Sequence, residues 1–321
     1  MKNSVESLIK SAKTAAVFHH INPDADAVGS ALAAAEMLKY YGVETVHCFS
    51  ENPLNEKLLS LDGAENFNPN PLKAYELAVV VDCSELSRIG NNCAKIFAKC
   101  AHSVVFDHHI GKGEFCDAAV IDVKAGSATQ VLYGFIKEFC PGALNAKMAN
   151  YLYAGLVTDT GGFLFPSVSV ATMEMAADLY KFDFNPSETA RLLLRNNPMR
   201  AFKLKAAAMS NARFYDNGRI GLIIFTKKVI ANAGAEESDT ENIISEIINI
   251  DSVQIAFAMT EISGNAYKVS IRSKGRASAL LCARCFGGGG HNAAAGCRVY
   301  GLLEDCIDKL VAAARDTAED A

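Results

Sequence analysis

The sequence predicts an α/β protein, with a parallel sheet in an N-terminal domain and a smaller α+β domain after it. In the first half, apolar runs without alternating polar residues are separated by stretches of helical periodicity. This pattern is typical of parallel strands that are buried on both faces. Residues with metal-binding side chains stand directly after several of these runs. After residue 212 the pattern changes to strand-like segments and a final helix, which indicates an α+β domain.

The composition is that of a globular protein and excludes several classes of function. The chain has 321 residues, of which 50% are apolar, and this length favours two domains. No apolar run approaches the roughly 20 residues of a membrane helix, and the N-terminus lacks the apolar core of a signal peptide. We therefore expect a cytoplasmic protein that does not bind membranes. The net charge of -5 argues against binding of long duplex nucleic acid.

The 10 cysteines are expected to be reduced, because no targeting signal directs the chain to an oxidising compartment. Cys282 and Cys285 form a single C-x-x-C pattern without a second close pair. A zinc ribbon is therefore disfavoured, and we expect a buried pair of thiols on a helix.

The first domain is expected to alternate strands and helices. The turn after the first strand contains Pro23, which fixes the backbone and opposes helix formation before it. The next helix is expected to stop at Gly42. Strands are predicted at residues 15–18, 43–49, 77–81 and 103–106, and helices at residues 31–40, 91–100 and 147–157.

Residues 186–212 are predicted to be a basic helical linker that breaks at Pro198 and acts as a hinge. Hairpin-like strands follow at residues 219–226, 253–261 and 267–272, and helices at residues 278–286 and 302–314. We accordingly divide the chain into a first domain of residues 1–185, the linker 186–212 and a second domain of residues 213–321.

Ligand-type residues gather at the predicted carboxyl ends of the strands. Such ends meet at one edge of a parallel sheet, where ligands usually bind. Carboxylate oxygens combined with imidazoles suit Mn²⁺ or Mg²⁺, and a pair of such ions can activate water at neutral pH. The alternative is that these residues only cap helices or lie in the core, but this would have to explain five separate segments. The residues are His20, Asp24, Asp26, Asp82, Asp107, His108 and His109, joined by Asp159, which follows the predicted helix 147–157.

A glycine run from Gly287 to Gly290, followed by His291, forms a second pattern. The backbone N–H groups of such a run can bind an anion, and Arg272 on a preceding strand could bind a phosphate with two hydrogen bonds. A flexible loop is the alternative. The GxGxxG fingerprint of dinucleotide binding is absent, which disfavours a dehydrogenase.

These motifs resemble those of the DHH phosphoesterases. The matching segments are residues 18–30, Val81-Asp82, residues 106–109 and residues 158–161, and residues 270–273 and 288–296 resemble the DHH-associated domain. The segments span nearly the whole chain. Its length is similar to that of the oligoribonuclease (nano-RNase) and pAp phosphatase group.

The resemblance implies a site for two Mn²⁺ ions, with Mg²⁺ or Co²⁺ as alternatives. One ion would be bound by His20 and Asp24, the other by Asp26, His108 and Asp159, with Asp82 as the bridge. Asp107 would orient His108, and His109 would face the scissile phosphate or its leaving oxygen. The substrate would be held across an interdomain cleft by Arg272, Gly288, Gly289, Gly290 and His291.

The resemblance also implies the reaction, which is in-line attack of a metal-bridging hydroxide on phosphorus. The expected substrates are short single-stranded RNA (nano-RNA), cleaved to mononucleotides, and 3′-phosphoadenosine 5′-phosphate (pAp). A cyclic di-AMP or linear dinucleotide phosphodiesterase is the alternative. The group suggests a homodimer. Leu164 and Asn292 depart from the basic residues that relatives often have near these positions, and both bear on substrate preference.

Overall fold

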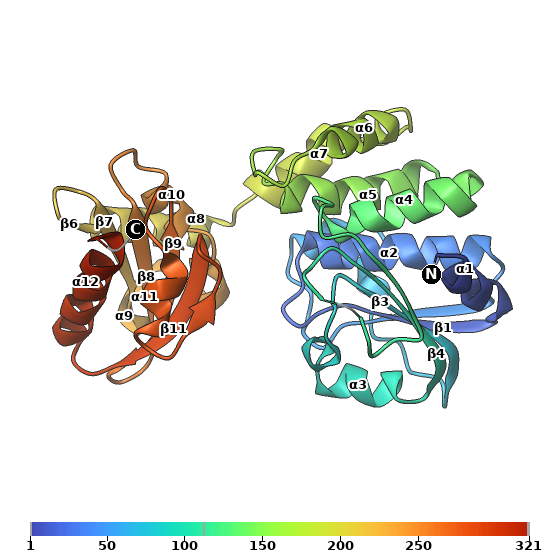
Figure 1. Ribbon diagram of the computed structural model, residues 1–321, viewed down its shortest axis with the longest axis horizontal. Helices are drawn as coiled ribbons and strands as arrows, with labels where there is room; N and C mark the ends of the chain where they lie inside the picture. Colours follow the sequence, from blue (N-terminus) through green and yellow to red (C-terminus); the bar gives the residue numbers. More distant parts are fainter. Residues whose placement is uncertain (1, 112, 320–321) are drawn as a thin grey trace. The chain divides into compact units, whose positions relative to one another are not determined.

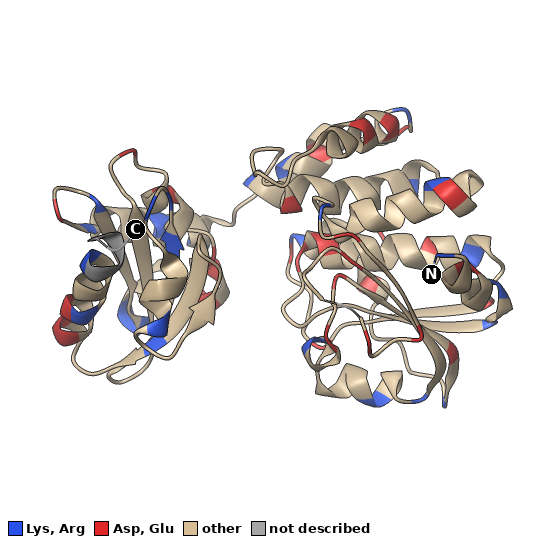
Figure 2. Ribbon diagram, viewed as in Figure 1, with Lys and Arg blue, Asp and Glu red and all other residues tan. Residues whose placement is uncertain are grey.

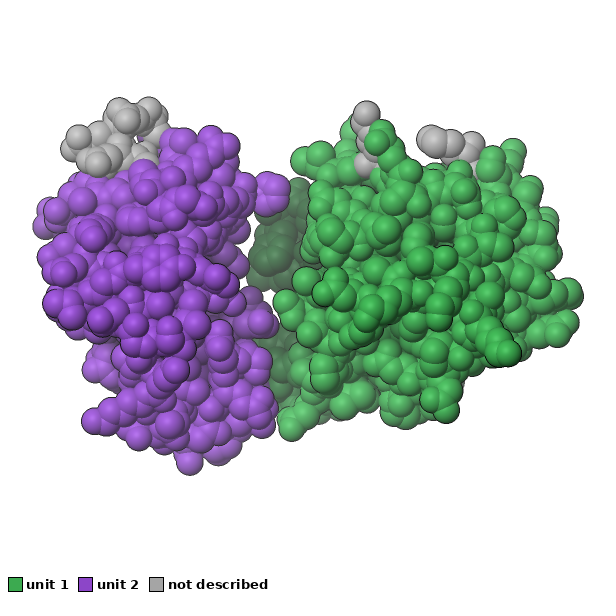
Figure 3. All heavy atoms as spheres, turned by 90° about the horizontal axis from the view of Figure 1, so that it is seen from below, with its two compact units in different colours: residues 1–196 green, residues 197–321 purple. Residues whose placement is uncertain are grey.

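The computed structural model describes residues 2–111 and 113–319, with side chains as far as residue 315. It divides into two compact units, which are residues 1–196 (unit 1) and residues 197–321 (unit 2) (Figure 3). The division falls inside the predicted linker 186–212. Each unit is described by itself below.

Unit 1 is built on a five-stranded parallel sheet (Figure 1). The strand order is β2-β1-β3-β4-β5, so the chain starts near one edge and moves across the sheet. The predicted parallel α/β fold is confirmed, and β5 is an additional strand. The strands are β1 (Thr14–Phe18), β2 (Thr45–Phe49), β3 (Tyr75–Val81), β4 (Cys100–Asp107) and β5 (Ala118–Ile121).

Helices and 3₁₀ turns cover both faces of this sheet. Alternate residues of the strands point to opposite sides: Val17 and Val79 belong to one core cluster, Phe18 and Val80 to another. The first cluster packs under α1, α2, α4 and α5, and the second under α3 (Figure 1). The helices and turns of unit 1 are α1 (Lys2–Ser11), α2 (Ala25–Tyr40), η1 (Leu58–Ser60), η2 (Ala64–Asn66), η3 (Leu86–Ile89), α3 (Asn91–Phe97), α4 (Ala128–Phe139), η4 (Pro141–Ala143), α5 (Ala146–Asp159), α6 (Val170–Leu179), α7 (Pro186–Ala190) and η5 (Arg191–Arg195).

Side-chain caps fix where the main helices of unit 1 begin. Asp24 caps α2 by accepting from the backbone N–H groups of Asp26 and Ala27, both at 3.0 Å. Ser127 caps α4 in the same way, and Asn145 caps α5. A predicted metal ligand, Asp24, is therefore also a helix cap.

Unit 2 contains a six-stranded mixed sheet in the order β10-β11-β9-β8-β7-β6. The prediction of hairpin-like strands holds for β8 and β9, which are antiparallel, but is wrong for β7 and β8, which are parallel. Residues 226–254 form the crossover between β7 and β8. The strands are β6 (Arg213–Tyr215), β7 (Ile220–Phe225), β8 (Ile255–Ser263), β9 (Ala266–Ser273), β10 (Gly289–Gly290) and β11 (Ala294–Tyr300).

The helices of unit 2 lie on both faces of its sheet. One core cluster joins the strands to α11 and α12, and the other joins them to α8 and α10. The helices are α8 (Met199–Ser210), α9 (Lys227–Ala233), η6 (Glu237–Thr240), α10 (Ile244–Ile248), α11 (Ala279–Arg284) and α12 (Leu303–Glu319). Among the helices of the described residues, none is long and apolar enough to cross a membrane.

All ten cysteines are free thiols. Cys282 is buried in α11, as predicted, but Cys285 is exposed directly after this helix. The prediction of a buried pair is therefore wrong for Cys285, because its Sγ lies on the outer side of the helix, 3.5 Å from the carbonyl oxygen of exposed Leu281.

Candidate metal centre

The predicted metal ligands of unit 1 come together at the carboxyl edge of its parallel sheet. β3 pairs with β1 on one side and with β4 on the other, so these three strands end next to one another. His20 follows β1 by two residues, Asp82 directly follows β3, and Asp107 is the last residue of β4. The parallel order therefore brings together residues that are far apart in the sequence.

Asp82 lies in the middle of the cluster. Its Oδ2 is 3.2 Å from Nε2 of His20, and its Oδ1 is 3.5 Å from Nε2 of His108 and 3.4 Å from Nδ1 of His109. Its backbone has φ 54°, an unusual value for a residue other than glycine. Asp82 therefore contacts imidazoles from two separate strand ends.

Asp82, Asp107, His108 and His109 form one group of candidate ligand atoms, and the described residues contain two further groups. His20, Asp24 and Asp82 each offer one ligand atom, and these atoms lie within 4.8 Å of one another. The same is true of Asp26, His108 and Asp159. In this last group, Nε2 of His108 is 3.9 Å from Oδ2 of Asp26 and 3.3 Å from Oδ2 of Asp159.

Asp107 is fully buried and holds the residues that follow it. Its Oδ1 accepts from the backbone N–H groups of His108 and His109 and lies 2.9 Å from Nδ1 of the His109 ring. The ring that Asp107 contacts is thus that of His109, whereas Nδ1 of His108 lies 3.3 Å from the carbonyl oxygen of Ala125. The two adjacent histidines are oriented by different partners.

The electrostatics of the cluster favour a bound cation. Burial alone would lower the pKa of His108, but the neighbouring carboxylates of Asp82, Asp26 and Asp159 raise it to about 10. Burial, together with the charges of Asp24 and Asp82, raises the pKa of Asp159 to about 6, although the charge of His108 opposes this change. The site therefore attracts positive charge strongly.

Among the described residues, two buried oxygens of the cluster have no hydrogen-bond partner: Oδ1 of Asp82 and Oδ2 of Asp107. Buried polar atoms are normally paired, so an unpaired carboxylate oxygen among histidines is suited to binding a cation. Hard carboxylate oxygens with imidazole nitrogens are suitable ligands for a divalent ion such as Mn²⁺. The residues present therefore fit a divalent metal site.

Two of the candidate metal ligands, Asp26 and His20, are also positioned by backbone groups that the sequence motifs did not reveal. Both oxygens of Asp26 accept from the first N–H groups of α4, those of Ala128 and Thr129. Nδ1 of His20 lies 2.7 Å from the carbonyl oxygen of Ile21. Ser127 followed three residues later by Gln130 is a helix-start pattern that could have revealed the N-terminus of α4.

The predicted substrate-binding residues lie in unit 2, whereas the candidate metal cluster lies in unit 1. Arg272 is half-buried on β9, donates to the carbonyl oxygen of Ile271 at 3.1 Å, and has its pKa lowered by burial. His291 is exposed and forms a tight turn, in which its backbone N–H donates to the carbonyl of Ala294 at 2.7 Å. Lys and Arg positions occur on strands and helices of unit 2, and Asp and Glu positions on several loops of unit 1 (Figure 2).

The second half of the glycine run forms an edge strand. Gly289 and Gly290 form β10, which pairs with β11. A Cβ at Gly288 would lie 2.2 Å from the carbonyl oxygen of Gly296, and one at Gly290, where φ is 142°, 2.6 Å from that of Ala294. Close backbone approach therefore requires glycine at these two positions.

Leu164 and Asn292, which were expected to bear on substrate preference, are both at the surface. Leu164 is 82% exposed in the turn after Asp159, and its backbone N–H donates to Thr160. Asn292 is exposed, and its side chain accepts from Ser278 at 3.2 Å.

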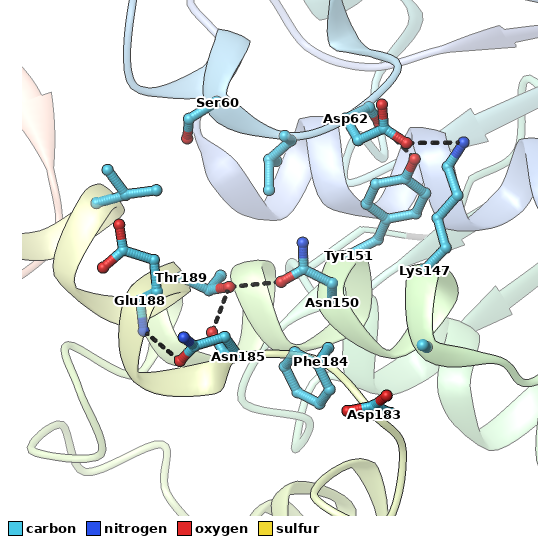
Figure 4. Close-up of a pocket in the computed structure, with 13 residues that line it drawn as sticks. Ser60, Asp62, Lys147, Asn150, Tyr151, Asp183, Phe184, Asn185, Glu188 and Thr189 are labelled. Atoms are coloured by element: carbon cyan, nitrogen blue, oxygen red, sulfur yellow. Dashed lines mark hydrogen bonds and ion pairs between the residues drawn. The ribbon is translucent and has the colours of Figure 1, made fainter.

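A pocket of about 410 Å³ lies elsewhere in unit 1, beside the first half of α5 (Figure 4). Its lining includes Asn150, whose Oδ1 accepts from Thr189, and Tyr151, whose hydroxyl donates to the carbonyl of Asp62. Asp159 is at the opposite end of α5, so this pocket is separate from the metal cluster.

Comparison with known families agrees with this geometry. The model of the DHH family, N-terminal domain, matches residues 14–156, and the model of the DHHA1 domain matches residues 224–320. The chain belongs to the DHH family of phosphoesterases, with a C-terminal DHHA1 domain.

Curated relatives point to a particular group within this family. The probable bifunctional oligoribonuclease and PAP phosphatase NrnA of Streptococcus mutans is 30% identical over 92% of this chain and 93% of its own length. The bifunctional oligoribonuclease and PAP phosphatase NrnA of Bacillus subtilis is 28% identical, and the match covers 97% of each chain.

Solved structures share the fold. An exopolyphosphatase-related protein from Bacteroides fragilis has a TM-score of 0.90 at 21% identity, covering 99% of this chain and 96% of its own. RecJ from Thermus thermophilus, solved in complex with Mn²⁺, has a TM-score of 0.56 at 15% identity, covering 100% of this chain and 54% of its own.

Proposed function

We propose that this protein is a Mn²⁺-dependent phosphoesterase that cleaves short RNA oligonucleotides to mononucleotides and converts pAp to AMP. The observation that carries the proposal is buried Asp82, which contacts both groups of candidate ligands. Its Oδ1 has no hydrogen-bond partner in the part of the chain that the structure describes. The names of the Streptococcus mutans and Bacillus subtilis relatives support the substrate class. The Mn²⁺ complex of the distantly similar RecJ supports the choice of metal.

Two ions fit the arrangement of side chains. His20, Asp24 and Asp82 would hold one ion. Asp26, His108 and Asp159 would hold the other, with Asp82 shared between them. When bound, such ions polarise a phosphoryl oxygen and lower the pKa of water.

His109 is the candidate proton donor to the leaving oxygen. Its Nδ1 is engaged by the buried carboxylate of Asp107, which leaves Nε2 as the ring nitrogen that carries the exchangeable proton. The side chain of His109 is 41% exposed, so a substrate can reach it. Asp107 keeps the ring in place through this contact and the backbone N–H groups that it accepts.

The groups of unit 2 would bind the nucleotide part of the substrate. Arg272 offers a guanidinium that can pair with a phosphate through two hydrogen bonds. Gly289 and His291 lie on an exposed hairpin edge beside it, because Arg272 and Ala294 are partners in the sheet. A cationic group and a strand edge would thereby contact the same anion.

The test is turnover by the full-length, Mn²⁺-loaded protein on a matched set of substrates. The set contains di- to pentaribonucleotides, a long single-stranded RNA, pAp, cyclic di-AMP and pyrophosphate. We expect mononucleotide release from the shortest RNAs to be fastest and AMP to form from pAp. Preference for cyclic di-AMP would instead assign the chain to second-messenger turnover, and no turnover of any phosphoester would overturn the proposal.

A further inference from the structure

Asp26 is held by a part of the chain that its own motif does not contain. The backbone N–H of Ala128 donates to Oδ2 of Asp26 at 2.6 Å, and that of Thr129 donates to Oδ1 at 3.0 Å. Ser127 accepts from the N–H of Gln130 at 3.1 Å and so fixes the first turn of α4. Asp26 is 0% exposed. Its orientation is therefore set by these contacts and not by solvent.

Because Gly155 on α5 has no side chain, the carboxylate of Asp26 can lie directly against this helix. A Cβ at position 155 would lie 2.3 Å from Oδ1 of Asp26 and 2.5 Å from Cγ2 of Thr129. Both distances are too short for real atoms, so any larger residue would displace Asp26 or the start of α4. Only glycine allows α5 to lie against both.

Gly155 also controls where the next ligand lies. Asp159 is four residues further along α5, and residues with this spacing lie on the same face of a helix, about one turn apart. The distance between α5 and Asp26 therefore also sets the distance between Asp159 and Asp26. His108 depends on the same region, because its Nδ1 lies 3.3 Å from the carbonyl oxygen of Ala125.

We propose that the backbone N–H groups of Ala128 and Thr129, together with Gly155, form a clamp on Asp26 that sets the geometry of one ion site. This site is the one that Asp26 shares with His108 and Asp159. The members of the clamp are positioning residues, since they contact the candidate metal ligand Asp26 and would not contact the substrate. The inference rests on the proposed function, because it concerns an ion that the proposed reaction requires.

The clamp predicts a selective effect. Residues that only orient a metal ligand typically contribute about 10- to 100-fold to metal affinity. The proposed ion at His20 and Asp24 would be held by side chains that do not accept from Ala128 or Thr129, so we expect its affinity to change much less. A general loss of folding would instead weaken both ions together.

The first test variant is Ala128→Pro, which removes the N–H that donates to Oδ2 of Asp26. Ala128 is the first residue of α4, a position where proline is well tolerated. The preceding Ser127 has φ -168° and ψ 161°, which is the extended conformation that a following proline requires. The matched control is Val170→Pro, at the first position of α6, where the side chain is 76% exposed.

The second variant is Gly155→Ala, which places a Cβ against Asp26. Its control is Gly134→Ala, because Gly134 is an exposed helical glycine with nothing within 4 Å of an added Cβ. Far-UV circular dichroism and melting in EDTA check that each variant folds. If Gly155→Ala does not fold, Ala128→Pro decides the question.

The measurement is Mn²⁺ binding by electron paramagnetic resonance and calorimetry on the full chain. We expect two ions in the wild type and in both controls, and in the two clamp variants one ion of nearly wild-type affinity and one about 10- to 100-fold weaker. Two ions of unchanged affinity in a folded clamp variant, or equal weakening of both, would overturn the clamp. A wild-type protein that binds no Mn²⁺ would overturn the proposed function itself, and the clamp with it.

Discussion

Nε2 of His20 lies 3.2 Å from Oδ2 of Asp82, while Oδ1 of the same carboxylate has no hydrogen-bond partner among the described residues. Asp82 is 2% exposed, so bulk water does not solvate that oxygen. A buried unpaired acceptor costs roughly 1–3 kcal/mol, more for a charged group. A bound cation would remove this cost, which makes Asp82 the most direct place to test the metal site.

We predict that Asp82→Asn lowers Mn²⁺ affinity and turnover by more than the roughly 100-fold expected for a residue that only orients a ligand. Asparagine tolerates the positive φ of this position, so the backbone should remain intact. Metal titration and steady-state kinetics measure the effect, with exposed Asp183→Asn as the control. Wild-type Mn²⁺ affinity in Asp82→Asn would remove Asp82 from the site.

His109→Asn should separate metal binding from proton transfer. The side-chain amide of asparagine can still donate a hydrogen bond to Asp107, but asparagine has no atom at the position of Nε2. We expect the Mn²⁺ stoichiometry to be unchanged and kcat to fall roughly 10²- to 10⁴-fold, as is typical when a general acid is removed. The control is His102→Asn on the exposed start of β4. A wild-type kcat would show that His109 transfers no proton.

Arg272→Ala is expected to raise KM for di- and triribonucleotides about tenfold, with a smaller effect on kcat, because it removes a phosphate contact away from the reacting bond. Arg272→Lys should also have a raised KM, since a lysine cannot form the two parallel hydrogen bonds to a phosphate. Arg298→Ala, on the exposed side of neighbouring β11, is the control. Equal KM values for wild type and Arg272→Ala would exclude Arg272 from substrate binding.

The glycine run allows structural and functional roles to be compared at adjacent positions. Gly290→Ala should destabilise unit 2, because φ is 142° and the new Cβ would meet the backbone of β11. Gly289→Ala meets no atom within 4 Å, so its melting temperature should match that of the wild type. If the strand edge binds phosphate, Gly289→Ala should still raise KM. An unaltered KM would leave Gly289 with no role in binding.

Asp178 should make stability depend on pH. Its carboxylate accepts from Lys181 at 2.8 Å, Tyr133 at 2.6 Å and Lys137 at 2.9 Å, and these bonds hold its pKa well below the usual value. The charged form is thus favoured in the folded state, so the stabilisation is full above the unfolded pKa of about 4 and disappears as the pH falls through the folded pKa.

We therefore expect Asp178→Asn to lower the free energy of unfolding by about 1 kcal/mol at pH 7, a modest value because both lysines are exposed. The difference from wild type should shrink steadily below pH 4. Urea unfolding at several pH values measures it. A difference that is the same at pH 7 and pH 3 would mean that the charge of Asp178 does not contribute.

The sequence was sufficient to predict the strands that carry the proposed metal ligands. β1, β3 and β4 are buried on both faces, so their apolar runs are uninterrupted and the polar residues at their ends stand out. β5 was missed because a four-residue edge strand, Ala118–Ile121, has too short a pattern to detect. The parallel pairing of β7 with β8 depends on a crossover that no local pattern reveals.

The side chains of the candidate site could be predicted from the sequence, but the backbone groups that position them could not. His20, Asp82 and His108 belong to recognisable motifs. Almost every residue has a backbone carbonyl and N–H, so the roles of the Ala125 carbonyl and the Ala128 N–H appear only once the chain is folded. Gly155 likewise acts through the approach of two distant helices, which is a tertiary property.

The continuity of unit 1 along the chain bears on the order of events during translation. Every proposed metal ligand lies between His20 and Asp159, and unit 1 is uninterrupted up to Asn196. Proteins are synthesised from the N-terminus, and their domains generally fold as units in that order. A nascent chain arrested after Asn196 therefore carries all of the proposed ligands and none of the proposed substrate contacts. Biosynthesis would therefore complete the proposed ion site before the proposed substrate-binding residues of unit 2 are made.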